Sequence, residues 1–183
     1  VLEIGCGWGG FAEYAASKYG SHITGITISQ AQHEYAIKRL QDAGLAEQTD
    51  IQLKDYRDIN QTFDKIVSIE MFEAVGETYW PTYFNTLSSC LRPEGKAALQ
   101  VITIADEIFH IYKAQPDFIQ RYIFPGGMLP SMTALASPLH KAGLKLVSET
   151  GYARDYARTL AVWKQQFNNA WPELVNTNRF DQR

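Results

Sequence analysis

Apolar residues along this chain fall into two alternating kinds of run. Short runs rich in β-branched and other apolar residues predict buried strands, and between them apolar residues recur at a helical spacing. Strands are predicted at 1–4, 22–28, 51–53, 63–69, 96–104 and 144–150. Helices are predicted at 11–19, 30–43, 78–91 and 132–142, the second with Ser29 as its cap. The alternation predicts an α/β fold with a doubly wound, mostly parallel sheet and helices on both faces.

One segment interrupts this alternation. Residues 105–130 lie between the fifth strand and the next helix and are longer than an ordinary connection. Ligands of open α/β sheets bind beyond the carboxyl ends of the strands, which is where this segment begins. We therefore expect a helical insertion at about 105–130 that contributes to a substrate pocket, although any single aromatic in it can simply pad the sheet. Its large side chains are Phe109, Tyr112, Phe118, Tyr122, Ile123 and Phe124.

The first predicted strand runs directly into a glycine-rich loop. Glu3 lies inside the strand, and Gly5, Gly7 and Gly9 follow it at every second position. Glycines at such a place let the backbone turn sharply and let a ligand approach the main chain. The dinucleotide-binding fingerprint differs, because its acid lies about 20 residues further on, and this loop has no Lys, Arg or Ser for a phosphate. The loop indicates either a tight strand-to-helix turn or a site for another class of ligand.

Composition narrows the classes of function. The chain has 183 residues, 45% of them hydrophobic and 20% charged, which fits one globular domain over 1–183 with no visible linker. A net charge of -3 gives no reason to expect nucleic acid as a partner. Contact with a membrane surface stays open, because local patches decide it, while no apolar run approaches the roughly 18 residues of a spanning helix.

Cysteine and histidine usage adds two expectations. Cys6 and Cys90 are too few for a disulfide framework and fit a reducing, cytoplasmic location, with contact to the inner membrane surface left open. The four histidines show no metal-ligand spacing, so no metal site is expected. They are His22, His33, His110 and His140.

Several blocks of sequence, in a fixed order and spacing from residue 1 to about 163, are together typical of one family. They are VLEIGCGWGG (1–10), GITIS (25–29) with Gln32, FDKIVSIEMFEAVG (63–76), FPGGMLPS (124–131), and DYARTL (155–160) before Trp163. Through these blocks the chain resembles the cyclopropane-fatty-acyl-phospholipid synthases and their mycolic-acid relatives. That group is a branch of the S-adenosylmethionine-dependent methyltransferases.

The resemblance implies S-adenosylmethionine as cofactor and assigns its site. Backbone groups of the glycine loop hold the methionine part, and the end of the second strand meets the ribose. A tyrosine after the third strand lies near the adenine. The implied cofactor residues are Glu3, Gly5, Gly7, Gly9, Thr27, Ile28, Gln32, Tyr56 and Ile69.

The resemblance also implies a reaction and its catalytic residues. An alkene attacks the activated methyl group, a carbocation forms on the acyl chain, and a base removes a proton from the new methyl group so that the ring closes. In the family a bound bicarbonate is thought to be that base. Glu73 matches the family's Glu and Tyr156 its Tyr, and both are expected on connections at the ligand end. Without a role in the reaction, Glu73 would be a helix-start carboxylate and Tyr156 a half-buried core residue.

The chain departs from the family pattern at three places. Gln100 occupies the position of the site His near the end of the fifth strand; it can donate and accept hydrogen bonds but carries no charge. Ala74 replaces the His that follows the Glu. The family's site Cys would precede Val1, and Cys6 is expected instead to be a small buried residue near the cofactor.

The ends look cut, since the family's sheet has seven strands and only six are predicted here. Residues 171–174 and 176–183 suggest a helix break and loop. The sequence therefore predicts a methyltransferase domain that makes a cyclopropane in an unsaturated phospholipid acyl chain. Alternatives are a methyl-branched acyl product, methylation of a small amine, or a non-catalytic cofactor-binding remnant.

Overall fold

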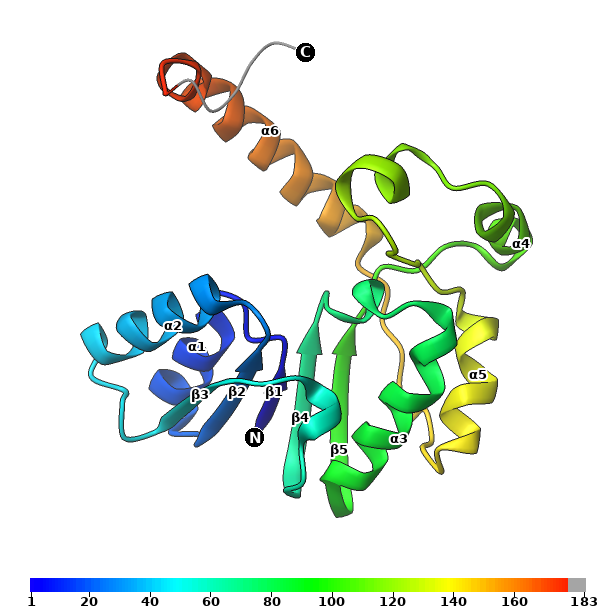
Figure 1. Cartoon of the computed structure of the whole chain (residues 1–183), viewed down its shortest axis with the longest axis horizontal. Coiled ribbons are helices and arrows are strands. Elements are labelled where there is room, and N and C mark those ends of the chain that lie inside the picture. Colours follow the sequence, from blue (N-terminus) through cyan, green and yellow to red (C-terminus); the bar gives the residue numbers. More distant parts are fainter. Residues whose placement is uncertain (178–183) are drawn as a thin grey trace. The chain divides into compact units, whose positions relative to one another are not determined.

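A five-stranded, all-parallel sheet forms the centre of the first of two compact units. The computed structural model describes residues 1–177; the first unit is Val1–Lys145 and the second begins at Leu146. The sheet order is β3-β2-β1-β4-β5, with β1 in the middle (Figure 1). Its strands are β1 (Leu2–Ile4), β2 (Ile23–Thr27), β3 (Thr49–Leu53), β4 (Phe63–Ile69) and β5 (Leu91–Gln100).

Helices cover both faces of this sheet, as the sequence predicted. Helices α1 (Gly10–Tyr19) and α2 (Gln30–Asp42) pack on one face through small side chains such as Ala12 and Ala36. Helices α3 (Trp80–Cys90) and α5 (Met132–Lys141) belong to a separate apolar cluster on the other face. The predicted cap of α2 is confirmed, because the hydroxyl of Ser29 accepts a hydrogen bond from the Gln32 N–H. The doubly wound α/β fold is therefore confirmed.

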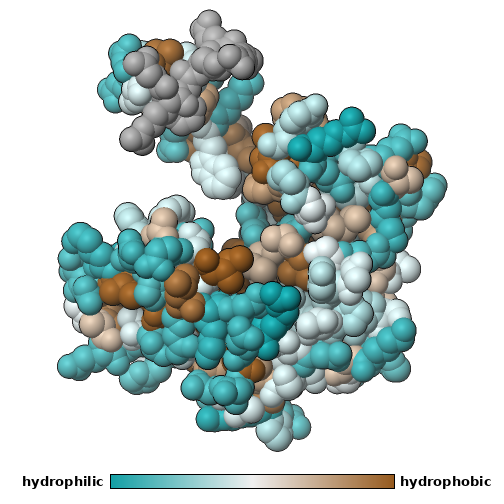
Figure 2. Space-filling model, viewed as in Figure 1, coloured by the Kyte–Doolittle hydropathy of each residue, from teal (hydrophilic) through white to brown (hydrophobic). Residues whose placement is uncertain are grey.

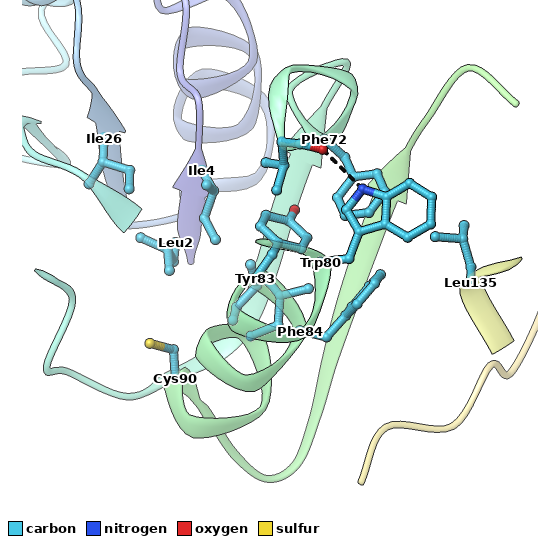
Figure 3. Packing of buried hydrophobic residues seen from close by; sticks show 12 residues of the cluster. Leu2, Ile4, Ile26, Phe72, Trp80, Tyr83, Phe84, Cys90 and Leu135 are labelled. Atoms are coloured by element: carbon cyan, nitrogen blue, oxygen red, sulfur yellow. Dashed lines mark hydrogen bonds between the residues drawn. The ribbon is translucent and has the colours of Figure 1, made fainter. Parts of the chain in front are cut away.

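Aromatic side chains dominate the core between the sheet and α3. Phe72, Trp80, Tyr83 and Phe84 are at most 3% exposed and contact one another (Figure 3). The indole Nε1 of Trp80 donates a 2.9 Å hydrogen bond to the carbonyl of Val75. This bond and the burial of Phe72 fix the segment that follows β4.

The insertion is helical, as expected. It contains α4 (Asp106–Ala114) and a π-helical turn, η4 (Ile119–Ile123). Its beginning is held to α5, because the Asp106 carboxylate accepts hydrogen bonds from the hydroxyl and the N–H of Thr133. Lys113 pairs with Glu77 at 2.6 Å and joins α4 to the 3₁₀ turn η3 (Glu77–Tyr79).

Two strand predictions need correction. β5 begins at Leu91 and ends at Gln100, and was predicted at 96–104. Leu91 already pairs with Phe63 ahead of a register shift, and the pairing with β4 ends where Ile69 meets Gln100. Residues 144–150 form no strand, although their apolar residues favour one. A strand needs a neighbour to complete its hydrogen bonds, and Leu146 and Val147 are instead 54% and 80% exposed.

The second unit consists mainly of one long helix, α6 (Ala153–Val175). The expected break at 171–174 is wrong, because α6 continues through Pro172. A proline removes one donor N–H from a helix but does not end it when the neighbouring turns stay paired. Near the end of the helix the Asn176 amide donates to the Pro172 carbonyl at 2.8 Å. The predicted loop continues to 183, and its part at 178–183 lies outside the described residues.

Candidate active site

The glycine loop after β1 is tightly packed at Gly5 and open at Gly7. Gly5 has φ +82°, and a Cβ there would lie 2.7 Å from Cγ of Met71. Gly7 has φ +51°, and a Cβ there would meet nothing within 4 Å. Among residues 1–177, the N–H groups of Gly7 and Trp8 donate to no backbone carbonyl. The loop thus offers free amide donors next to space that a ligand can fill.

Glu3 lies directly before this loop and carries an unpaired oxygen. Its side chain is 3% exposed, and within the described residues its Oε2 has no hydrogen-bond partner. Burial raises the pKa of this carboxyl to about 8. Cys6 is also buried, as expected, and burial raises the pKa of its thiol to about 12. A cationic group beside Glu3 would relieve the cost of burying its charge.

Three predicted cofactor residues lie together at the carboxyl end of β2. The hydroxyl of Thr27 donates to Oε1 of Gln32 at 2.8 Å and accepts from the N–H of Ser29 at 3.1 Å. This fixes the Gln32 amide and leaves its nitrogen as a donor. Ile28 follows and is 79% exposed. The arrangement provides polar groups and an apolar side chain at one edge of the sheet.

Tyr56 and Ile69 follow the next two strand ends. Tyr56 begins the 3₁₀ turn η1 (Tyr56–Asp58), and its ring contacts the edge of Tyr83 at a centroid distance of 5.4 Å. The bidentate pair between Arg57 and Asp55 holds that turn. Ile69 is the last residue of β4 and is 38% exposed. The predicted cofactor residues therefore lie at the carboxyl ends of β1 to β4 or in the loops and first helical turns that follow these ends.

Glu73 connects three segments of the first unit. It lies in the 3₁₀ turn η2 (Phe72–Ala74), directly after β4 as predicted. Its Oε1 accepts a 2.6 Å hydrogen bond from the N–H of Ile102, after β5, and its backbone carbonyl accepts from Met128 in the insertion at 2.8 Å. Within the described residues Oε2 is buried and unpaired, and burial raises the pKa of the carboxyl.

Gln100 has a partner that sequence reasoning missed. It is the last residue of β5, and its Nε2 donates a 2.9 Å hydrogen bond to Oε1 of Glu70. The N–H of Glu70 in turn donates to the Gln100 carbonyl at 2.9 Å. The only sequence signal for Glu70 was its place directly after β4, three residues before Glu73.

Tyr156 does not lie where it was expected. It was predicted on a connection at the ligand end, but it belongs to α6 in the second unit, where its N–H donates to the Tyr152 carbonyl. The tyrosine was expected on the connection that follows a strand at 144–150. Because that strand does not form, the expected position of Tyr156 is wrong as well. Its part in a site stays a prediction.

The insertion exposes some of its aromatic side chains and packs another against the core. Phe109 stacks on Trp80 and anchors the segment, which is the padding role that was left open. Phe118, Tyr122 and Phe124 are 65–70% exposed, and the first two line a surface hollow together with Arg121. The surface over the insertion mixes hydrophobic and hydrophilic areas (Figure 2). An apolar ligand would find partners here.

The described part of the chain contains neither a candidate metal site nor a helix that could span a membrane. Across residues 1–177, no group of His, Cys, Asp and Glu side chains is arranged to hold a metal ion. Nor does that stretch contain a helix with the length and apolar character needed to cross a membrane.

Comparison with known proteins places these features in a family. The family model of mycolic acid cyclopropane synthetase matches residues 1–183. Tuberculostearic acid methyltransferase UfaA1 of Mycobacterium tuberculosis is 40% identical over 168 residues, which cover 91% of this chain and 39% of that protein. The cyclopropane-fatty-acyl-phospholipid synthase of Escherichia coli is 38% identical over 176 residues, 96% of this chain and 44% of that protein. The chain thus spans about two fifths of the length of these curated relatives.

A solved structure shares the fold. It is the crystal structure of mycolic acid cyclopropane synthase CmaA1 complexed with SAH and CTAB, which matches with a TM-score of 0.85 at 24% identity. The match covers 96% of this chain and 65% of that chain.

The buried carboxyl of Glu3 predicts a pH-dependent stability. Between pH 4.5 and about 8 the folded protein keeps a proton that the unfolded chain has released, so the free energy of unfolding falls as pH rises. The amide that replaces the carboxyl in the variant Glu3→Gln cannot ionise. Without cofactor, the free energy of unfolding of Glu3→Gln should therefore rise relative to that of the parent across this window, by at most about 1.4 kcal/mol per pH unit. Urea unfolding at pH 5, 6.5 and 8 measures this. The exposed control Glu47→Gln should follow the parent, and parallel profiles for Glu3→Gln and the parent would contradict the assignment.

Proposed function

Because the chain belongs to the mycolic acid cyclopropane synthetase family, we propose that it carries the methyl-transfer site of an enzyme that forms cyclopropane fatty acids. The substrate is the double bond of an unsaturated acyl chain in a phospholipid. The observation that carries this proposal is the carboxyl of Glu73, whose Oε2 is buried and has no partner among the described residues. Its other oxygen and its backbone link the ends of β4 and β5 to the insertion. The activity is proposed for the full-length protein, since its curated relatives are longer than this chain.

The residues at the carboxyl end of β1 fit S-adenosylmethionine as the methyl donor. This cofactor supplies an electrophilic methyl group on a sulfonium and also carries an ammonium. The open space beside Gly7, the free amides of the loop and the unpaired oxygen of Glu3 are the features that such a group requires. The SAH named in the CmaA1 structure supports the same choice. We assign binding to Glu3, Gly5, Gly7, Gly9, Thr27, Ile28, Gln32, Tyr56 and Ile69.

Glu73, Gln100 and Tyr156 are proposed as the catalytic residues. Methylation of an alkene leaves positive charge on the acyl chain, and ring closure then requires loss of a proton from the new methyl group. A bicarbonate ion would supply the base for that proton. The free oxygen of Glu73, which takes a proton readily because burial raises its pKa, is a partner for such an ion. Gln100 adds amide donors and Tyr156 a phenol.

The acyl chain is proposed to contact the insertion. Its exposed side chains Phe118, Tyr122 and Phe124 supply apolar area, and the backbone bond from Met128 to Glu73 links the insertion to the catalytic carboxyl. A double bond held beside this segment would therefore lie near Glu73. Contact of the same surface with a membrane is part of this proposal.

A methyl-branched product is the second proposal. It shares the methyl transfer and the cation but needs a reductant in place of the base. Support for this second product comes from a relative that is 40% identical and is named tuberculostearic acid methyltransferase. Retention of Glu73 favours the ring.

Cofactor binding can be tested with two matched glycine variants. Gly7 and Gly20 have φ values of +51° and +60°, and a Cβ at either would meet open space, but only Gly7 lies in the ligand loop. Valine at either site should cause similar backbone strain. Gly7→Val should abolish the fluorescence response of Trp8 to S-adenosylhomocysteine, whereas Gly20→Val should keep it. Calorimetry checks both, and an equal loss of affinity in the two variants would contradict the site.

The role of Glu73 can be tested with an isosteric change. Glu73→Gln keeps an oxygen for the Ile102 N–H but can no longer take up or release a proton, so turnover should fall about 100-fold or more while cofactor affinity changes less than about twofold. Mass spectrometry of the lipid products from the full-length protein measures turnover. Glu47 is exposed and precedes β3, at the end of the sheet opposite the site, so Glu47→Gln should match the parent. Full activity of Glu73→Gln would exclude this carboxyl from the reaction.

A further inference from the structure

Two glutamates have a backbone conformation that their side chains disfavour. Among the described residues, Glu70 with φ 50° and Glu94 with φ 63° are the non-glycine residues with positive φ. Residues with a Cβ rarely adopt this region, and those that do often lie at functional sites. Glu94 lies near the beginning of β5 and Glu70 directly after the end of β4, so the two mark opposite ends of the sheet.

The fold itself does not need a glutamate at position 70. The N–H of Glu70 donates to the Gln100 carbonyl, a bond that a glycine would make equally well and without strain. Both side chains are exposed, and an exposed hydrogen bond between side chains adds little stability. What the glutamate adds over glycine is its carboxylate, and that carboxylate accepts the Nε2 hydrogen bond of Gln100 at 2.9 Å.

The surroundings of Glu70 belong to the candidate site. Met71, the next residue, lies so close to Gly5 in the glycine loop that a Cβ on Gly5 would overlap its side chain. Glu73 follows two residues later and is held by the N–H of Ile102, which comes two residues after Gln100. The link between Glu70 and Gln100 thus runs parallel to the link between Glu73 and the segment after β5.

We propose that Glu70 is a positioning residue that orients the amide of Gln100 for the reaction, and that its strained backbone is retained for this purpose. With one Nε2 hydrogen directed to Glu70, Gln100 presents its Oε1 and its second N–H to the site in a fixed orientation. The proposal rests on the proposed function, in which Gln100 contacts the reacting groups.

Glycine substitutions at the two strained positions form a matched pair. Both Glu70→Gly and Glu94→Gly should raise the melting temperature of the full-length protein by a few degrees, because each relieves a positive φ. Glu70→Gly should lower kcat at least tenfold with little change in cofactor affinity, whereas Glu94→Gly should stay within twofold of the parent. Glu70→Gln, which keeps an acceptor oxygen, should restore part of the loss. A lower melting temperature for Glu70→Gly, or unchanged turnover, would overturn the proposal.

A double-mutant cycle tests whether Glu70 acts through Gln100. If it does, Glu70→Gly should have little further effect on kcat in a Gln100→Ala background. Independent, multiplicative losses would show that Glu70 acts in another way and would overturn the proposal.

An amide signal separates this proposal from the proposed function. In ¹⁵N-glutamine-labelled protein without cofactor, the Nε2 signal of Gln100, identified by its loss in Gln100→Leu, should shift in Glu70→Gly and not in Glu94→Gly. An unchanged signal in Glu70→Gly would overturn the positioning role. If the signal shifts in Glu70→Gly but the parent protein makes no lipid product, the proposed function is overturned instead, and with it the catalytic purpose of Glu70.

Discussion

The candidate site depends on the anchoring of the segment that follows β4. Trp80 donates its indole N–H to the Val75 carbonyl inside an aromatic core, and Phe72 is buried beside it. Since the residues on both sides of Glu73 are fixed in this way, its carboxyl has a defined position near the end of β5. The bond from Ile102 completes that position. Core packing and the geometry of the candidate site are therefore the same constraint in this part of the molecule.

The acidic side chains of the candidate site have no basic partner in the described part of the chain. In the described part of the chain, Glu3, Glu70 and Glu73 form no ion pair, and burial raises the pKa of the first and the last. Such groups are costly in an isolated protein but favourable beside positive charge. A sulfonium cofactor and a carbocation on an acyl chain both carry such charge, so the electrostatics fit the proposed chemistry.

The sequence predicted the features that depend on local pattern. Apolar runs and glycine spacing located the parallel strands and the loop after β1, and position in a motif placed Glu73 after β4. Features that depend on distant partners were missed. The apolar run at 144–150 favours a strand but has no neighbouring strand to pair with. The predicted position of Tyr156 depended on that strand and was therefore wrong. Glu70 escaped notice because its positive φ and its bond to Gln100 arise only in the folded chain.

Isotope labelling of the lipid product distinguishes ring closure by a base from simple methylation. Cells that make the full-length protein would be fed methionine with a trideuterated methyl group, and their phospholipid acyl chains examined by mass spectrometry. The proposed function predicts a cyclopropane whose ring methylene keeps two deuterons, because the base removes the third when the ring closes. A methyl branch that retains all three deuterons, or acyl chains without label, would contradict it.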